Sequence, residues 1–152
     1  MKEGITLTYI DEKEKGVQYR VRPGAYAIIV REEDDKIGIV TDGKDIFYLG
    51  GGIEEGESEL EALKRELIEE AGYTLKNIQE FDKIGSYLFA EEHGYLEVIA
   101  NVFIAEFDEK ITEPVEKDHH IIWVSAEDYI GKMFREWQNY ILKEFIQKRK
   151  RK

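Results

Sequence analysis

The chain has 152 residues, of which 42% are hydrophobic and 12% aromatic. That length favours one compact domain with a real core, and the composition argues against disorder. Its 33 acidic and 22 basic residues give a net charge of −11. Without the five basic residues 148–152, 17 basic residues remain and the balance is −16. The chain without this tail is acidic enough to repel a nucleic-acid backbone, which disfavours polynucleotide binding. A polyanionic substrate could still bind if cations lie between it and the protein.

The sequence shows no export or membrane signal. It has no cysteines, which removes disulfides and thiolate metal sites and suits a reducing compartment. The start, MKEGITLTYIDEKEKG, lacks a signal-peptide pattern, and no apolar run is long enough to cross a bilayer. We therefore expect a soluble, cytoplasmic protein with no membrane partner. The oligomeric state is left open, a homodimer included.

Alternating or β-branched runs predict eight strands. They lie at residues 5–10, 17–21, 25–30, 37–40, 46–49, 84–89, 96–107 and 121–124. The segment EEDDK at 32–36 predicts a hairpin turn between the third and fourth of these strands. The long run at 96–107 belongs at the centre of a sheet.

Two segments predict helices. The first begins after Ser58, where SELE forms a capping box with Glu61, and ends at Gly72, a residue suited to a left-handed terminus. The second runs from about residue 134 into the basic tail, which suits the helix dipole. Its apolar stripe indicates core packing and consists of Phe134, Trp137, Ile141 and Phe145. Because the strands do not alternate regularly with helices, we predict a mixed α/β fold with helices packed against a sheet.

Three carboxylates crowd the end of the first helix, where RELIEEAG spans residues 65–72. Glu66, Glu69 and Glu70 share one side, since residues three and four apart are neighbours on a helix. Their repulsion costs about 0.2–0.5 kcal/mol per pair, and the helix dipole disfavours negative charge in the last turn. The helix alone leaves two interpretations open, a solvated acidic face and a site for Mg²⁺ or Mn²⁺.

The surroundings of these glutamates are also predicted. An apolar stripe for the core consists of Leu60, Leu63, Leu67 and Ala71, while Glu59 and Ala62 lie on the glutamate side. Before the helix, LGGGIEEGE at 49–57 predicts a glycine-rich loop. Its glycines let the backbone approach a ligand closely, and beside the glutamates they favour a ligand site.

Residues 51–73, GGIEEGESELEALKRELIEEAGY, resemble the signature of the Nudix hydrolase family, G-x5-E-x7-R-E-U-x-E-E-x-G-U. The matched positions are Gly51, Glu57, Arg65, Glu66, Leu67, Glu69, Glu70 and Gly72, with Tyr73 in the last apolar place. The resemblance implies a Nudix fold, a mixed sheet sandwiched between α-helices. We expect a single domain over residues 1–152 with a basic tail at 148–152. The resemblance also implies hydrolysis of a nucleoside diphosphate linked to another group.

The resemblance further implies roles for these residues. Two or more Mg²⁺ or Mn²⁺ ions would be held by Glu66, Glu69, Glu70, Glu57 and the Gly50 carbonyl. Arg65 would orient these carboxylates without touching substrate. Gly50 departs from the family, whose members often have proline there, but a backbone carbonyl ligand survives that change. Bound cations would neutralise phosphate charge and lower the pKa of an attacking water.

Residues outside the signature supply further candidates. The general base is either a signature glutamate or a loop carboxylate, and Glu116 is preferred over Asp118, Glu91 and Glu92. His119 and His120 are candidates for proton transfer, with simple exposure as the alternative. Phosphate contacts are expected from Arg20, Arg22, Gly51 and Gly52, although the arginines equally suit a surface pair. Base stacking is expected from among Tyr26, Phe47, Tyr87, Phe89 and Trp123, unless these strand aromatics are core.

Subfamily markers guide the substrate prediction by their absence. Positions 88 and 89 lack the proline typical of ADP-ribose hydrolases, and positions 89 and 90 lack the tyrosine of dinucleoside polyphosphate hydrolases. The chain therefore resembles the mutator-type branch, whose members act on nucleoside triphosphates, sometimes oxidised ones such as 8-oxo-dGTP. Thr41 and Asp42 stand where some of those members have basic residues. The alternatives are a nucleotide sugar, a dinucleoside polyphosphate, or a nucleotide-binding regulator without turnover.

Overall fold

The computed structural model describes residues 4–115 and 118–150. Its first half contains β1 (Leu7–Tyr9), β2 (Arg20–Arg31), β3 (Lys36–Thr41), β4 (Ile46–Phe47), β5 (Leu49–Gly52) and α1 (Glu59–Ala71). Its second half contains β6 (Tyr73–Ala90), β7 (Gly94–Lys110), β8 (His120–Val124), the short 3-10 helix η1 (Ala126–Tyr129) and α2 (Glu136–Lys150). None of the helices in these two ranges is both long and apolar enough to span a membrane.

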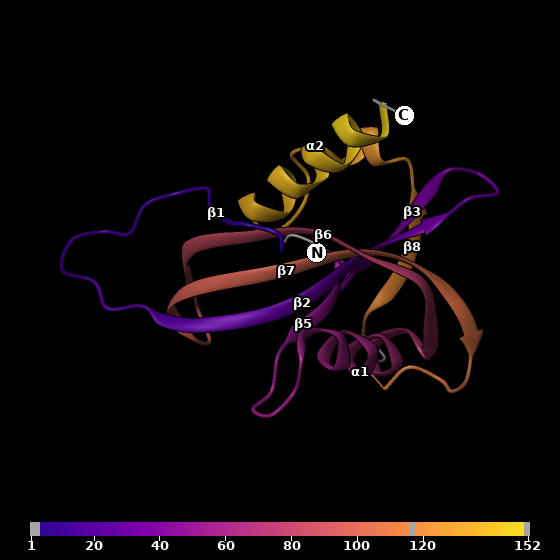
Figure 1. Cartoon of the computed structure of the whole chain (residues 1–152), viewed down its shortest axis with the longest axis horizontal. Coiled ribbons are helices and arrows are strands. Elements are labelled where there is room, and N and C mark those ends of the chain that lie inside the picture. Colours follow the sequence, from indigo (N-terminus) through magenta and orange to yellow (C-terminus); the bar gives the residue numbers. More distant parts are fainter. Residues whose placement is uncertain (1–3, 116–117, 151–152) are drawn as a thin grey trace.

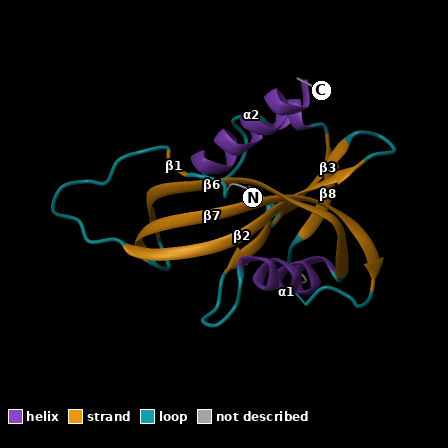
Figure 2. Ribbon diagram, in the orientation of Figure 1, coloured by secondary structure: helices purple, strands orange, loops and turns teal. Residues whose placement is uncertain are grey.

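A mixed sheet forms the middle layer of the molecule, with α2 on one face and α1 on the other (Figure 1). The strands follow the order β1-β6-β7-β2-β3-β4, while β5 pairs with β2 and β8 with β3. Figure 2 shows β6, β7 and β2 running alongside one another. β2 is parallel to β7 over ten residue pairs, and antiparallel to β3 and β5. The predicted mixed sheet between helices is therefore confirmed.

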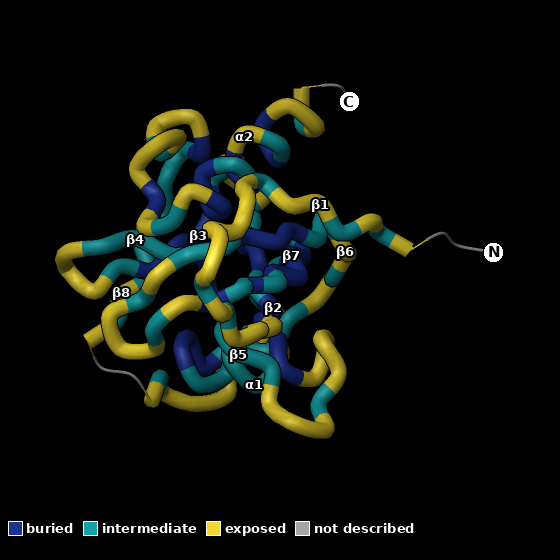
Figure 3. Tube along the Cα trace, turned by 90° about the vertical axis from the view of Figure 1, so that its left-hand side faces the viewer, coloured by how far each residue is buried: buried dark blue, intermediate teal, exposed yellow. Residues whose placement is uncertain are grey.

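The two faces of β2 serve separate cores. Ile28 packs on the α2 side, whereas Ala27 and Ile29 pack on the α1 side, as the two-residue period of a strand requires. Buried backbone concentrates in the middle of the molecule, between the two helices (Figure 3). Each helix thus covers one face of the same strand.

Several strand predictions were wrong in extent. The predicted strand at 17–21 does not exist as a separate element: β2 begins at Arg20 and continues through Pro23 and Gly24 to Arg31. Proline and glycine usually interrupt a strand, but β2 continues through Pro23 and Gly24 because β7 pairs with one edge of it and β5 with the other. The predicted strand at 84–89 is part of β6, which starts at Tyr73. Its polar first half is held by hairpin pairing with β7, with three register shifts.

The glycine-rich segment is a strand over its first four residues rather than a loop. β5 pairs with β2 in the register Gly50↔Tyr26, Gly51↔Ala25 and Gly52↔Gly24. Gly50 has φ 136°, and a Cβ there would lie 2.2 Å from the Ala25 carbonyl oxygen. A proline cannot adopt that φ, so the departure from the family's usual residue is a backbone requirement of this chain.

The ends of α1 are as predicted. The Ser58 hydroxyl accepts a hydrogen bond from the Glu61 N–H at 3.1 Å, and the Glu61 carboxylate accepts one from the Ser58 N–H at 2.9 Å. Gly72 closes the helix with φ 75°. The apolar face was predicted incorrectly at two positions, because Leu60 is 39% exposed and Ala62 is fully buried. The buried arc is therefore rotated toward residues 62, 66 and 70, which brings Glu66 and Glu70 against β5.

α2 begins two residues later than predicted. Trp137, Ile141 and Phe145 are buried as expected, whereas Phe134 precedes the helix and is 44% exposed. The predicted hairpin turn at 32–36 is confirmed between β2 and β3. In the basic tail, Arg149 forms an ion pair with Asp35 of that turn.

Candidate active site

Arg65 joins the signature glutamates into one network. Its Nε and Nη2 donate to the two oxygens of Glu57 at 2.6 and 2.9 Å. Nη1 lies 3.0 Å from Glu66 and 3.5 Å from Glu69, and Nη2 donates to the Gly52 carbonyl at 3.0 Å. Such forked contacts to carboxylates are strong and directional. The guanidinium lowers the pKa of the Glu57 carboxyl, which stays ionised.

Glu66 depends on the absence of a side chain at Gly51. A Cβ at that position would lie 2.7 Å from the Glu66 carboxyl carbon. The side chain of Glu66 is only 15% exposed, and it occupies the space above the glycine strand. Gly51 therefore permits close approach of the carboxylate to β5.

Glu70 is the most buried of the signature glutamates, with 8% exposure. Its Oε1 accepts a hydrogen bond from the Gly50 N–H at 2.7 Å. Its Oε2 lies 3.8 Å from His119 Nδ1. Proline has no N–H, so a proline at position 50 would leave this carboxylate without its backbone donor.

The glutamates supply hard oxygen donors of the kind that Mg²⁺ and Mn²⁺ prefer. Among residues 4–115 and 118–150, however, no three acidic or histidine side chains gather into a ready-made metal group. Arg65 pairs with three of the carboxylates, and the fourth is bonded to Gly50. The donor chemistry therefore fits a divalent cation, and in the arrangement shown Arg65 offsets part of the carboxylate charge.

A cavity of about 270 Å³ opens beside Glu70 on the α2 side of the sheet. This volume is near the lower end, about 300 Å³, of pockets that take small molecules. Its aromatic walls are Tyr26, Phe47, Tyr48, Phe134 and Trp137, and its aliphatic walls are Leu88, Ala90, Leu96 and Val98. Its polar rim consists of Arg22, Glu70, His93, His119, Arg135 and Gln138, with Gly50 and Gly51.

The structure brings some predicted residues to this cavity and leaves others away from it. Arg22, Tyr26, Phe47 and Gly51 line it, and so does His119. Gly52 lies beside the Arg22 guanidinium. Exposed positions away from the cavity are occupied by Arg20, Asp118 and His120. Glu91 and Glu92 do not line the cavity but border an adjoining hollow, and Glu116 lies outside the described residues.

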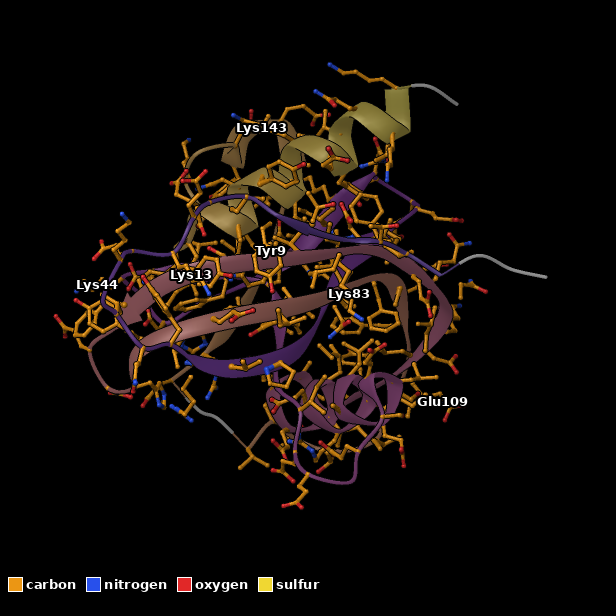
Figure 4. The ribbon with its side chains drawn as sticks, turned by 60° about the vertical axis from the view of Figure 1, so that its left-hand side comes forward. Tyr9, Lys13, Lys44, Lys83, Glu109 and Lys143 are labelled. Carbon is orange, nitrogen blue, oxygen red and sulfur yellow. The ribbon has the colours of Figure 1, made fainter. Side chains whose placement is uncertain are left out.

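Three predicted stacking aromatics have other contacts. Tyr87 stacks on Tyr9 with ring centroids 5.3 Å apart, on the strand face that Figure 4 shows around Tyr9. Phe89 meets Tyr95 edge-on. Trp123 packs under the Arg31 guanidinium. None of the three lines the cavity.

Sequence reasoning missed the start of α2 as part of the site. Trp137 was correctly predicted as buried, but its ring also forms a cavity wall. Gln138 is 4% exposed and its Oε1 accepts the Arg135 N–H at 3.3 Å. The side-chain carbonyl therefore has a partner within the chain, and the amino group can donate to a ligand in the cavity. The helical spacing of apolar residues in α2 does not distinguish residues that pack in the core from residues that line a cavity.

Comparison with known proteins decides the family. The NUDIX domain family model matches residues 21–145, which is most of the chain. The chain belongs to the Nudix family. It is a Nudix hydrolase, and the signature network and cavity described above lie within the matched range.

Solved structures share the Nudix fold. A MutT structure from work on Aliivibrio salmonicida and Vibrio cholerae is 23% identical, with a TM-score of 0.64 over 85% of this chain and 99% of that chain. MutT from Bacillus halodurans is 23% identical, with a TM-score of 0.66 over 80% of both chains. A structure described as an ADP compounds hydrolase is 18% identical, with a TM-score of 0.65 over 85% of this chain and 73% of its own. No curated protein matches the chain.

Proposed function

We propose that this Nudix hydrolase cleaves a nucleoside triphosphate, in the presence of Mg²⁺ or Mn²⁺, to nucleoside monophosphate and pyrophosphate. The observation that carries the proposal is the aromatic cavity that opens onto Gly50, Gly51 and Glu70. A base held in that cavity has its phosphates directed at the glutamate network. The retained signature carboxylates favour this enzyme over a regulator without turnover.

The metal ligands of the proposal are the residues named from the signature. Glu66, Glu69 and Glu70 would hold two or more cations, together with Glu57 and the Gly50 carbonyl. When bound, such cations neutralise phosphate charge and lower the pKa of the attacking water. Arg65 orients Glu57 and Glu66 through the bonds described above.

Other residues of the chain bind and position substrate in this proposal. Arg22 lines the cavity and supplies positive charge beside an acidic network, so it would contact phosphate. Removal of the proton from water falls to a signature glutamate or to Glu116, with Asp118, Glu91 and Glu92 as further candidates. Cytoplasmic nucleotides are the expected substrate pool.

The residues that line the cavity also indicate which nucleotide base it would prefer. Trp137 and Tyr26 offer apolar ring surfaces, and Gln138 offers an amino group. An amino donor favours a base with a carbonyl at its edge, such as guanine or uracil, over adenine, which has no carbonyl. Guanine nucleotides, the oxidised 8-oxo-dGTP among them, are therefore the first substrates to test.

A nucleotide linked to a larger group is the second candidate. A hollow of about 680 Å³ adjoins the cavity and shares Phe47, Phe134 and Arg135 with it. Lys44 also lines this hollow and extends at the end of the molecule (Figure 4). A nucleotide sugar or a dinucleoside polyphosphate would use this space, whereas a triphosphate would not.

A nucleotide panel tests the proposal. Nucleoside triphosphates, nucleotide sugars and dinucleoside polyphosphates are incubated with Mg²⁺ or with chelator, and products are identified chromatographically. We expect metal-dependent release of nucleoside monophosphate and pyrophosphate, with most turnover lost in Glu69→Gln and Glu70→Gln. Glu55→Gln, at an exposed position between the glycine strand and α1, is the matched control. Tight nucleotide binding with no turnover across the panel would refute the proposal and favour the regulator.

A further inference from the structure

The Tyr26 ring is held in one place by its neighbours. Tyr26 shares a face of β2 with Arg22 and Gly24, since residues two apart point the same way. A Cβ at Gly24 would lie 2.7 Å from Tyr26 Cε2 and 2.8 Å from its hydroxyl oxygen. On the other side, the Trp137 ring centroid is 4.9 Å away. The ring therefore leans back over Gly24, in a space that only glycine leaves open.

This position brings the hydroxyl to the junction of the cavity and the glutamate network. Gly24 pairs with Gly52 of β5, and the Arg22 Nη2 atom would lie 3.5 Å from a Cβ at Gly52. Tyr26 lines the cavity together with Arg22 and Glu70. The hydroxyl is thus close to both a cation and the signature carboxylates.

Within residues 4–115 and 118–150, the Tyr26 hydroxyl is acted on by the charges of Arg22, Glu66 and Glu70 and by no hydrogen bond. Tyr48, another tyrosine of the cavity wall, donates a hydrogen bond to the Gln138 backbone carbonyl at 2.6 Å. Partly buried tyrosine hydroxyls usually have a partner. Burial, and then the charges of Glu66 and Glu70, raise the pKa of Tyr26 to about 12, while Arg22 acts in the opposite direction. A tyrosine hydroxyl is protonated at neutral pH and able to donate.

We propose that the Tyr26 hydroxyl donates a hydrogen bond to the phosphate that is attached to the nucleoside. The inference rests on the proposed function, because it requires a base in the aromatic cavity. The signature carboxylates would repel an incoming phosphate. Hydrogen-bond donors to the phosphate are therefore needed where the cavity meets these carboxylates. Arg22 and Tyr26 flank Gly24 on one face and supply such donors. Tyr26 is accordingly a substrate-binding residue outside the signature.

Binding without turnover tests this role. For the base that the wild-type protein binds most tightly, we would measure dissociation constants of the nucleoside and of its 5′-monophosphate, with chelator present. Tyr26→Phe keeps the ring and removes only the hydroxyl. We expect it to weaken monophosphate binding about 10-fold or more, because the lost bond is to a charged group. Nucleoside binding and thermal stability should stay as in the wild type.

The control is Tyr140→Phe, the same change at a partly buried tyrosine of α2 that does not line the cavity. It should alter neither dissociation constant. Equal losses for nucleoside and monophosphate in Tyr26→Phe would place the hydroxyl on the base or ribose and overturn the inference. Unchanged monophosphate binding would also overturn it, with the proposed function intact if the wild type still hydrolyses triphosphates. A wild type that neither binds nor hydrolyses nucleotides would overturn both.

Discussion

Gly50 and Gly51 are adjacent in β5, and alanine at each should have opposite consequences. A Cβ at Gly50 meets the Ala25 backbone oxygen at 2.2 Å, and the residue has φ 136°. A Cβ at Gly51 meets the Glu66 carboxyl carbon at 2.7 Å, at the far end of a flexible side chain. Backbone cannot move aside cheaply, whereas a carboxylate can rotate. Gly50→Ala should therefore damage the fold, and Gly51→Ala should damage the site.

The magnitudes follow from these contacts. A strained backbone costs about 1–3 kcal/mol and overpacking about 1–3 kcal/mol more, so Gly50→Ala should lose roughly 2–6 kcal/mol. At about 2–4 °C per kcal/mol for a chain of this size, its melting temperature should fall by roughly 4–24 °C. Gly51→Ala should lose about 1 kcal/mol or less by the same reasoning, because Glu66 can turn away. A misplaced carboxylate should nevertheless lower kcat/KM about 100-fold.

Two measurements on the same pair of variants check this prediction. Thermal unfolding followed by circular dichroism gives the stability difference, and metal-dependent hydrolysis of the preferred nucleotide gives the activity. The reasoning fails if the two variants melt at the same temperature. It also fails if Gly51→Ala hydrolyses substrate at the wild-type rate, because Glu66 would then not need its place against β5.

Three further variants probe the caps, the charge network and the base. Ser58→Ala should cost about 1 kcal/mol in thermal melts and leave metal dependence unchanged, since it removes only the capping bond of α1. Arg65→Met should lower the melting temperature at pH 7. Because Arg65 depresses the folded-state pKa of Glu57, the stabilisation exists above the unfolded value of about 4.3 and is lost as the pH falls through the lower folded value. The gap to wild type in melts should therefore close below about pH 4, and a constant gap would contradict the assignment. Gln138→Leu should reduce the kcat/KM preference for GTP over ATP about tenfold, and an unchanged ratio would remove Gln138 from base recognition.

Local interactions account for what was predictable from the sequence. The caps of α1 at Ser58 and Gly72 depend on residues within four positions, and both were located correctly. The spacing of Arg65, Glu66, Glu69 and Glu70 identifies the family because the whole signature lies in one continuous segment, from the end of β5 through α1 to the start of β6. The mixed sheet between helices follows from the same resemblance.

Pairing between distant segments decided the remainder. β6 is 18 residues long because β7 supplies its hydrogen bonds, although its first half is too polar to read as a strand. The glycine run became β5 because β2 pairs with it, and within that pairing Gly50 has a φ of 136°, which a proline cannot adopt.

The chemistry of the signature was thus determined by the sequence itself, since its carboxylates lie within 14 residues of one another, from Glu57 to Glu70. The cavity was decided by tertiary structure alone. Its walls come from Arg22 and Tyr26 in β2, from Leu96 in β7, and from Trp137 and Gln138 in α2. Residues more than 100 positions apart acquire a shared surface only when the sheet and α2 pack together, and no local pattern records that contact.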